Sequence, residues 1–403
     1  MKKRYIIIGN GVAGVSAFEE IRKYDRFGEI FLFYQEEKPY YYRASLSEMI
    51  HGKNTPEMLD GRTEAYYHAL NIKRIHAQVK KVDAVNQMVY THDDQYHFDE
   101  LLIATGAAAR KIPLTEDIES LVYRNFDDAQ RITSSLAERK WLLIIGAGVL
   151  GLELAAAVRK LPGKHIAIVQ HSGQIGRPIL DSQASDWIIE RLQTDGITLF
   201  LNDEIEAISG STARLSSGAV WNYDLVVQTI GVTPIFPQID ELKAGKGIQI
   251  DHHCQTNLAH IYAAGDCTET LDRSHQKWTP SRTWLEASQQ GKTAGANMAG
   301  VAATIPETTF YNASYLYKDH YVMIGEPHGP ADEIHLWKHQ DGYRKIRILD
   351  RKVIGALLIS NRQRHLSIRD AINNHVRVEG DRIADPDFDW NFISGNNWDY
   401  HFF

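Results

Sequence analysis

Two glycine-rich hexapeptides are the residues of this sequence best suited to hold a charged ligand. They are Gly9-Asn10-Gly11-Val12-Ala13-Gly14 and Gly146-Ala147-Gly148-Val149-Leu150-Gly151. In this spacing the first glycine permits a sharp turn, the second lets backbone amides approach a pyrophosphate, and the third lets a helix pack closely on a strand. The phosphate then lies at a helix N-terminus, where unpaired N–H groups favour negative charge. Two copies predict two dinucleotides, between which electrons move.

Each hexapeptide needs a buried strand before it and a helix after it. The first unit is expected to contain strand Tyr5–Ile8, helix Val12–Arg22 and strand Ile30–Tyr34, and the second strand Trp141–Ile145, helix Val149–Lys160 and strand Ile166–Val169. Such units form parallel, doubly wound sheets. The predicted fold class is α/β, with two Rossmann-like, three-layer ββα dinucleotide-binding domains and a smaller α+β C-terminal domain.

Three further apolar strands end in glycine, where ligands bind in open α/β sheets. They are Leu101–Gly106, Leu225–Gly231 and Ile261–Asp266. A helical pattern then runs from Thr283 to Met298. Beyond residue 306 the pattern changes to short strands and one helix near Leu366–Asn373, which predicts the separate C-terminal domain.

Composition indicates an ordinary globular protein of two or three domains. The chain has 403 residues, 43% hydrophobic and 24% charged, and a net charge of −7. We therefore expect no nucleic-acid partner and no membrane association. The basic residues before Tyr5 are followed by too short an apolar run for a signal peptide. Two cysteines, Cys254 and Cys267, fit a reducing cytoplasm.

Five motifs together resemble the two-dinucleotide flavoproteins of the pyridine nucleotide–disulfide oxidoreductase superfamily. In chain order they are Gly9–Gly14, Ala104–Gly106, Gly146–Glu153, Thr229–Pro234 and Tyr262–Asp266. Within that superfamily, Pro39-Tyr40-Tyr41-Tyr42-Arg43 followed by Leu46-Ser47 is similar to NADH:rubredoxin oxidoreductases, nitrite reductase flavin domains and ferredoxin reductases.

The resemblance implies FAD at the first glycine turn and NADH or NADPH at the second. The expected FAD domain is 1–114 with 233–305, the NAD(P)H domain is 115–232, and the C-terminal domain is 306–403. The residues expected to contact the two cofactors are Gly9, Gly11, Val12, Ala13, Gly14, Glu36, Arg43, Ala104, Thr105, Gly106, Arg110, Gly146, Gly148, Val149, Leu150, Gly151, Gln170, Gly231, Gly265, Asp266, Thr283 and Trp284. We assign no metal site.

Several of these residues are expected to contact a particular part of a cofactor. Glu36, with Glu37 as its close alternative, would accept hydrogen bonds from a ribose hydroxyl. The resemblance places Arg43 at the FAD pyrophosphate, Arg110 at FAD, and Asp266 at its ribityl or phosphate part. It also places Glu153 beside the nicotinamide and flavin.

The residue after strand Ile166–Val169 bears on the choice between NADH and NADPH. A carboxylate there would bind the 2′-hydroxyl of NADH, and a basic cluster would favour the 2′-phosphate of NADPH. The chain has Gln170-His171, with Arg177 nearby. This pattern leaves the coenzyme open, with NADH slightly favoured.

The cysteines do not match a protein disulfide relay. Some members of the superfamily, the NADH peroxidases and CoA-disulfide reductases, use a single cysteine near the flavin, and alignment on them puts Ala44 at that position. Cys254 is expected to be structural. Cys267 is expected to be buried near the cofactor. Direct flavin chemistry remains, with a hydride passing from NAD(P)H to flavin N5. The helix that begins at Thr283-Trp284 would stabilise the charge of the reduced flavin.

Glu48 departs from the resemblance, because ferredoxin reductases often carry a lysine there that pairs with the glutamate of the second turn. If Glu48 and Glu153 both approached the flavin, their repulsion would raise the pKa of one of them. A solvated helix face is an equally good interpretation of Glu48. We name Glu153 and Glu48 as catalytic candidates.

The electron acceptor is open among three classes. Residues 342–369 contain eight basic residues and one acid, which predicts a docking face at Arg344–Arg369 for an acidic carrier such as rubredoxin or ferredoxin. The alternatives are an NAD(P)H oxidase or reductase of oxygen, quinone or nitrite, and a non-enzymatic NAD(P)H sensor. Seven aromatic residues between Phe388 and Phe403 indicate packing within a monomer or a homodimer.

Overall fold

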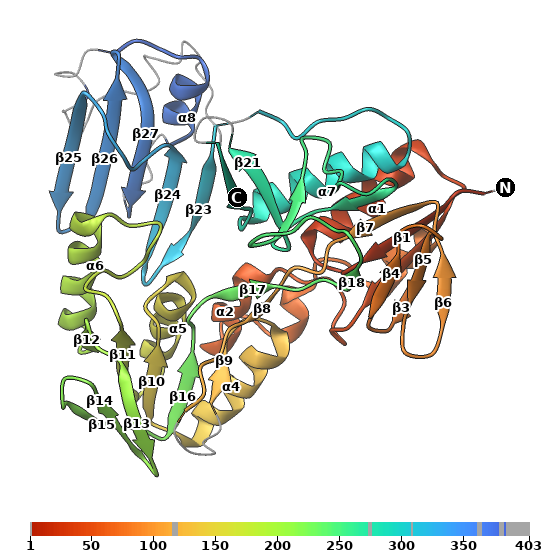
Figure 1. Ribbon diagram of the computed structural model, residues 1–403. Coiled ribbons are helices and arrows are strands. Elements are labelled where there is room, and N and C mark those ends of the chain that lie inside the picture. Colours follow the sequence, from red (N-terminus) through yellow and green to blue (C-terminus); the bar gives the residue numbers. More distant parts are fainter. Residues whose placement is uncertain are drawn as a thin grey trace. The chain divides into compact units, whose positions relative to one another are not determined.

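The computed structural model describes residues 2–114, 120–272, 276–307, 309–360, 365–378 and 383. These residues form two compact units (Figure 1). Unit 1 comprises Met1–Arg110, Arg124–Phe126 and Gly231–Pro306, and unit 2 comprises Lys111–Tyr123, Asp127–Ile230 and Glu307–Phe403. The aromatic C-terminal segment, with Arg362 and Arg364, lies outside the described residues.

Unit 1 is built on a parallel five-stranded sheet in the order β20-β7-β1-β2-β3. The strands are β20 (Ile261–Ala263), β7 (Glu100–Ile103), β1 (Arg4–Ile8), β2 (Glu29–Tyr34) and β3 (Ile72–His76). The central strands are almost completely buried, as expected of a sheet with both faces covered. The predicted strands Tyr5–Ile8 and Ile30–Tyr34 are therefore confirmed.

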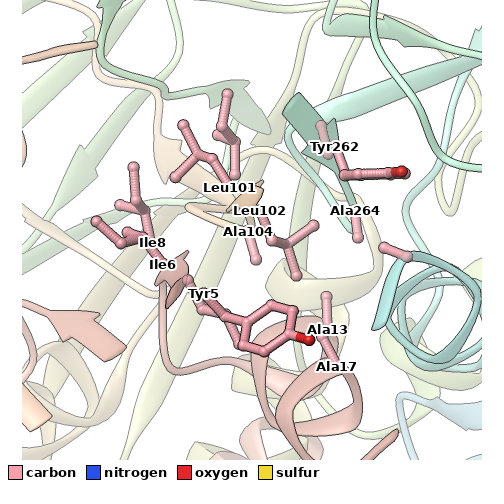
Figure 2. Close-up of a cluster of buried hydrophobic side chains, with 14 of the residues drawn as sticks. Tyr5, Ile6, Ile8, Ala13, Ala17, Leu101, Leu102, Ala104, Tyr262 and Ala264 are labelled. Carbon is pink, nitrogen blue, oxygen red and sulfur yellow. The ribbon is translucent and has the colours of Figure 1, made fainter. Parts of the chain in front are cut away.

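Helices α1 (Val12–Tyr24) and α7 (Trp284–Met298) pack against each other beside this sheet. Two glycines of α7 allow close contact, because a Cβ on Gly291 would lie 2.2 Å from the carbonyl oxygen of Ala13, and one on Gly295 2.5 Å from that of Ala17. Figure 2 shows Ala13 and Ala17 beside the apolar residues of β1, β7 and β20. The first hexapeptide is thereby joined to the core of unit 1.

Smaller elements complete unit 1. They are α2 (Leu46–Ile50), α3 (Glu64–Ala69), β4 (Lys81–Asp83), β5 (Met88–Tyr90), β6 (Gln95–His97), β8 (Ala107–Ala109), β17 (Val232–Pro234), β18 (Gln238–Ile239), β19 (Ile248–Ile250), β21 (Thr268–Asp272) and β22 (Lys277–Pro280). These strands form separate sheets β18-β4-β5-β6, β19-β21-β22 and β17-β8.

Unit 2 contains a second parallel sheet, in the order β12-β11-β10-β16-β9. Its strands are β12 (Thr198–Leu201), β11 (His165–Gln170), β10 (Trp141–Ile145), β16 (Leu225–Gln228) and β9 (Leu121–Val122). The unit also has helices α4 (Phe126–Glu138), α5 (Val149–Arg159) and α6 (Ser182–Thr194), and the antiparallel sheet β13 (Ile205–Ser209), β14 (Thr212–Leu215) and β15 (Val220–Asn222). The α/β class predicted for both glycine units is confirmed.

The C-terminal part of unit 2 is an antiparallel sheet in the order β23-β24-β27-β26-β25, with one helix. Its elements are β23 (Tyr311–Leu316), β24 (Asp319–Gly325), β25 (Glu333–His339), β26 (Gly342–Leu349), β27 (Lys352–Ile359) and α8 (His365–Asn373). The short strands and the helix near Leu366–Asn373 expected beyond residue 306 are present, so the predicted α+β character is confirmed. In the described parts of the chain, no helix is long and apolar enough to cross a membrane.

Candidate functional site

Both glycine turns have the backbone geometry that their sequence predicts. Gly9 and Gly146 adopt φ angles of 119° and 104°, in the region that favours glycine. A Cβ on Gly14 would lie 2.0 Å from the carbonyl oxygen of Gly9, and one on Gly151 2.2 Å from that of Gly146. The first and third glycines of each hexapeptide are therefore required by the turn itself.

The middle glycines leave open space where a ligand would lie. A Cβ on Gly11 or Gly148 would meet no atom within 4 Å, and these two residues begin α1 and α5 without a capping side chain. By contrast, Asp181 caps α6, with its carboxylate accepting a hydrogen bond from the Ala184 amide. Uncapped N–H groups beside an open glycine fit a pyrophosphate. The predicted contact residues Val12, Ala13, Val149 and Leu150 lie in the first turns of these helices.

The carboxylate of Glu36, just after β2 in unit 1, is held by two hydrogen-bond donors. The Glu36 carboxylate accepts hydrogen bonds from the Tyr41 hydroxyl at 2.6 Å and from Arg43 Nη2 at 2.7 Å. Glu37, the alternative from the sequence, is exposed and lies 3.6 Å from the His76 ring. Glu36 is therefore the carboxylate that the fold builds into this end of the sheet, and Arg43 lies beside it.

Arg124 is absent from the residues predicted from the sequence. Its guanidinium donates to the Asp266 carboxylate at 2.6 Å and to the Ala107 carbonyl at 3.2 Å, while its own carbonyl accepts from Arg43 Nη1 at 2.8 Å. Arg124 thus joins the predicted contact residues Arg43 and Asp266 into one network of unit 1. No sequence pattern marks it, because it lies in the three-residue segment Arg124–Phe126, isolated along the chain from the rest of this unit.

The other predicted contact residues of unit 1 lie at strand ends and turns. The Ala104 amide, directly after β7, donates to the Ile8 carbonyl at 2.8 Å. Thr105 and Gly106 continue this turn, and Thr105 Oγ1 donates to the Ile235 carbonyl. The Gly265 amide donates to Gln290 Oε1 at 2.8 Å, directly before Asp266. Arg110 donates its amide to the Gly231 carbonyl at 2.9 Å, where β8 and β17 pair.

Tyr67 of α3 is a second residue that the sequence did not indicate. Its hydroxyl donates to Asn10 Oδ1 at 2.9 Å and accepts from the Tyr40 amide at 3.3 Å. The side chain is fully buried. Tyr67 therefore fixes Asn10, the residue between the first two glycines of the first turn, although it lies 57 positions further along the chain.

Glu153 is buried in α5, two residues after the third glycine of the second turn, and is 9% exposed. Burial raises the pKa of this carboxyl to about 8, although Ser314 Oγ, which donates to it at 3.4 Å, opposes the rise. Ser314 belongs to β23, so the C-terminal sheet covers this acid. A solvated helix-surface position for Glu153 is excluded.

Glu48 has different surroundings. Burial acts to raise the pKa of its carboxyl, but the hydrogen bonds from Lys53 Nζ at 2.5 Å and Asn54 Nδ2 at 2.7 Å prevail and lower it. The raised pKa of Glu153 comes from burial. Glu48 belongs to unit 1 and Glu153 to unit 2, and the repulsion expected between the two carboxylates stays a prediction. A catalytic role for Glu48 stays a prediction.

Three comparisons with known proteins agree with this geometry. The model of the family described as pyridine nucleotide-disulphide oxidoreductase matches residues 3–291. The chain belongs to this family. The cofactors of this family are FAD and NAD(P)H.

Among curated relatives, the assimilatory nitrate reductase electron transfer subunit of Bacillus subtilis (strain 168) is 25% identical over 96% of this chain and 51% of the relative. An NADH oxidase of Methanocaldococcus jannaschii is 30% identical over 74% of this chain and 71% of the relative. A rubredoxin-NAD(+) reductase of Pseudomonas putida is 26% identical over 75% and 81%. The chain spans about half the length of the first of these relatives.

Two solved structures share the fold. The ferredoxin reductase for the CYP199A2 system of Rhodopseudomonas palustris has a TM-score of 0.89 at 22% identity, covering 98% of this chain and all of that one. The putidaredoxin reductase–putidaredoxin complex gives 0.88 at 22% identity, covering 98% of each chain. Near-complete coverage includes the C-terminal sheet, for which the sequence offered no specific motif.

The two cysteines of this oxidoreductase are free and buried. Burial raises the pKa of the Cys267 thiol to about 11, and also raises that of Cys254. A reactive cysteine needs a lowered pKa and access. Neither cysteine meets these requirements, which agrees with the expectation that the chain lacks a redox-active disulfide.

The start of α7 differs from the starts of α1 and α5. Thr283 caps it through a capping box, with Thr283 Oγ1 accepting from the Glu286 amide at 3.2 Å and the Glu286 carboxylate accepting from the Thr283 amide at 3.2 Å. The Trp284 side chain is 54% exposed. That this helix end stabilises reduced flavin stays a prediction.

The expected docking face at Arg344–Arg369 is wrong in part. Arg344 and Arg347 are buried, and the Arg347 guanidinium donates to the carbonyls of Glu326, His328 and Pro330. Lys345 pairs with Asp181 at 2.6 Å. Arg344 Nη2 donates to the Ile383 carbonyl at 3.4 Å. These three cations therefore hold the protein's own chain and do not form an exposed docking face.

Proposed function

We propose that this protein takes a hydride from NAD(P)H at the second glycine turn and passes the electrons, through FAD held at the first, to a small electron-carrier protein. The observation that carries the proposal is the pair of uncapped, open glycine turns in one chain whose two cysteines are buried and unpaired. Two dinucleotides without a thiol relay leave the flavin as the point of electron exit.

The residues of unit 1 would bind FAD. The amides after Gly11 would receive the pyrophosphate, and Glu36 would accept hydrogen bonds from the ribose. Arg43 and the Arg124–Asp266 pair lie on the same network and would orient the phosphates and the ribityl chain. FAD supplies a two-electron acceptor that can release its electrons singly or together.

The residues of unit 2 would bind the nicotinamide coenzyme. Gly148 begins α5 with open space before it, and Glu153 presents a neutral carboxyl near neutral pH, because its pKa is about 8. A neutral carboxylic acid can donate a hydrogen bond without placing a second negative charge beside the flavin, which becomes negative on reduction. The named relatives that act on rubredoxin and the complex with putidaredoxin support a carrier protein as acceptor.

The test has two steps. The purified yellow protein is titrated anaerobically with NADH and with NADPH, and bleaching of the flavin absorbance is recorded. The reduced protein is then mixed with rubredoxin, ferredoxin or air in a stopped-flow instrument. We expect reoxidation by a carrier to exceed reoxidation by air, and to slow as salt rises if charges guide association.

An NAD(P)H oxidase is the second candidate, favoured by the 30% identity to the relative named NADH oxidase. Reoxidation by air at least as fast as by either carrier would support it against the carrier proposal. Turnover below that of free flavin with every acceptor would contradict both and favour a sensor.

A further inference from the structure

Glu153 lies between the second glycine unit and the C-terminal sheet, which both belong to unit 2. Its helix α5 packs against β10 and β11 and also against β23. The two parallel strands are buried and apolar along their middle, whereas β23 brings the Ser314 hydroxyl to Glu153 Oε1 at 3.4 Å. The hydrogen-bond partner of this acid therefore comes from the C-terminal sheet and not from the glycine unit.

The face of the sheet that carries Ser314 also carries Tyr321 and Asn312. Tyr321 of β24 pairs with Ser314 across the two strands and is buried, and its hydroxyl accepts a hydrogen bond from Asn312 Nδ2 at 3.0 Å. Burial, followed by the charge of Glu153, raises the pKa of the Tyr321 hydroxyl. Tyr321 is thus a second titratable group that faces Glu153, and it is neutral near neutral pH.

The buried carboxyl of Glu153 is not balanced by a cation. Among the residues that the structure describes, it forms no ion pair. By contrast, acids at the two ends of α6 pair with cations of the C-terminal part of unit 2, Asp181 with Lys345 at 2.6 Å and Asp195 with Lys318. Two acids next to this sheet are therefore held as ions, whereas Glu153 is held by a neutral hydroxyl.

A serine hydroxyl can hold a carboxyl group in either protonation state. It donates a hydrogen bond to the ionised form and accepts one from the protonated form, because its own proton can rotate. A lysine or arginine would favour the ionised form alone. Because burial raises the pKa of Glu153 to about 8, both forms occur at accessible pH, and Ser314 can keep Oε1 in place in each.

We propose that Ser314 is a positioning residue for the reaction with NAD(P)H, because its hydrogen bond holds the Glu153 carboxyl in place for the step in which this carboxyl acts in its protonated form. This inference rests on the proposed function and adds the C-terminal sheet to the coenzyme site. Flavin reduction slows once Glu153 has lost its proton, since the carboxylate then adds a negative charge where negative charge already develops.

The first measurement follows the titration of Glu153 in the full-length protein without coenzyme. Infrared difference spectra from about pH 5 to about pH 10 record the C=O band of protonated carboxyls, and the part that Glu153→Gln removes belongs to Glu153. We expect its midpoint near pH 8 in the parent. Ser314→Ala should raise the midpoint by about half a pH unit or more, because the lost hydrogen bond favours the ionised form. Ser314→Thr keeps a hydroxyl and should titrate like the parent.

The second measurement shows whether the same titration controls the reaction. The rate constant of anaerobic flavin reduction by saturating NADH or NADPH is recorded over the same pH range in a stopped-flow instrument. It should fall about tenfold with the midpoint of the infrared band, in the parent and in Ser314→Ala alike. Ser360→Ala is the matched control, because Ser360 Oγ follows β27 of the same sheet and donates to Asp319 and not to Glu153. It should leave both midpoints unchanged.

The two measurements fail in different ways. An infrared midpoint that stays in place in Ser314→Ala, or that moves equally in Ser360→Ala, would overturn the inference. A rate constant that does not follow the infrared midpoint would also overturn it and would leave the proposed function standing. An infrared midpoint that moves as expected, without reduction of the flavin by either coenzyme, would support the hydrogen bond between Ser314 and Glu153 and overturn the proposed function.

Discussion

The two glycine turns of this oxidoreductase are nearly identical in backbone and different in what surrounds them. In both, a Cβ added to the third glycine would lie within 2.2 Å of the carbonyl oxygen of the first, and the middle glycine faces open space. After the next strand, however, the first turn has Glu36, paired with Arg43, and the second has Gln170, bound to Ala147. We propose that the turn is the phosphate site in both units, and that the residue at the end of the following strand distinguishes one dinucleotide from another.

A second difference lies two residues after each third glycine. Ser16 of α1 shares a 3.0 Å hydrogen bond with Ser288 of α7 and is part of the packing of unit 1. Glu153 of α5 occupies the equivalent place and meets Ser314 of the C-terminal sheet. The same helical position thus serves packing in one unit and holds an ionisable group in the other.

The largest effect is expected from alanine at the third glycines. Gly14→Ala and Gly151→Ala each place a Cβ about 2 Å from a backbone oxygen, which we expect to cost about 2 kcal/mol or more of unfolding free energy. Gly14→Ala should lose FAD, whereas Gly151→Ala should keep the yellow colour and lose reduction by NAD(P)H. Flavin absorbance and thermal unfolding measure both effects.

Gly11→Ala and Gly148→Ala are the controls, because their Cβ atoms meet nothing. They should unfold like the parent and weaken one cofactor each. If Gly14→Ala and Gly151→Ala impaired the same cofactor, the assignment of one dinucleotide to each turn would be wrong.

Glu153 should make stability depend on pH. Its pKa is raised from 4.5 to about 8, so the folded protein binds one more proton than the unfolded chain between these values. The contribution of Glu153 to the free energy of unfolding is therefore fully present below about pH 4.5. It is lost as pH rises towards 8, by at most about 1.4 kcal/mol per pH unit. Thermal unfolding of Glu153→Gln compared with the parent from pH 5 to 8 measures this contribution as a difference in slope.

Glu48→Gln provides the contrast, since the pKa of Glu48 is lowered by Lys53 and Asn54. It should not flatten the slope between pH 5 and 8. An unchanged pH dependence of flavin reduction in Glu48→Gln would also remove Glu48 from the catalytic candidates.

Glu36→Gln removes the carboxylate that distinguishes the first turn. We expect the dissociation constant of FAD to rise about tenfold, because a charge-assisted bond to Arg43 and a ribose acceptor are both weakened. Equilibrium titration of the apoprotein with FAD gives the value. Glu37→Gln, the same change one residue later on an exposed side chain, should bind FAD like the parent.

Tyr67→Phe should give the smallest effect, about threefold weaker FAD binding, because it removes one buried hydroxyl and leaves the ring in place. Tyr66→Phe is the matched control, since its hydroxyl bonds Glu19 at 2.8 Å and not the turn. In an Asn10→Ala background Tyr67→Phe should have no further effect on FAD affinity. An equal loss in that background would show that Tyr67 does not act through Asn10.

The sequence predicted what depends on local patterns. Both strand–turn–helix units and the buried strands before Gly9 and Gly146 were found within a few residues of their expected bounds. The short strands and the helix expected beyond residue 306 were also found. Glycine spacing and apolar periodicity act over a few residues, so they are readable without neighbours. The sequence also predicted a buried Cys267 and a structural Cys254, and both cysteines are free and buried.

Tertiary structure alone decided the contacts between distant residues. Arg124 reaches Asp266 and Tyr67 reaches Asn10 across more than fifty positions. The basic run around Arg347 reads as a surface in the sequence, but the sheet turns it inward, where its charge is balanced by carbonyls and by Asp181. Charge and residue type are local properties, whereas burial and partnership depend on which strands become neighbours. Hence the two glycine turns could be predicted from the sequence. The distant residues that form hydrogen bonds beside each turn could not.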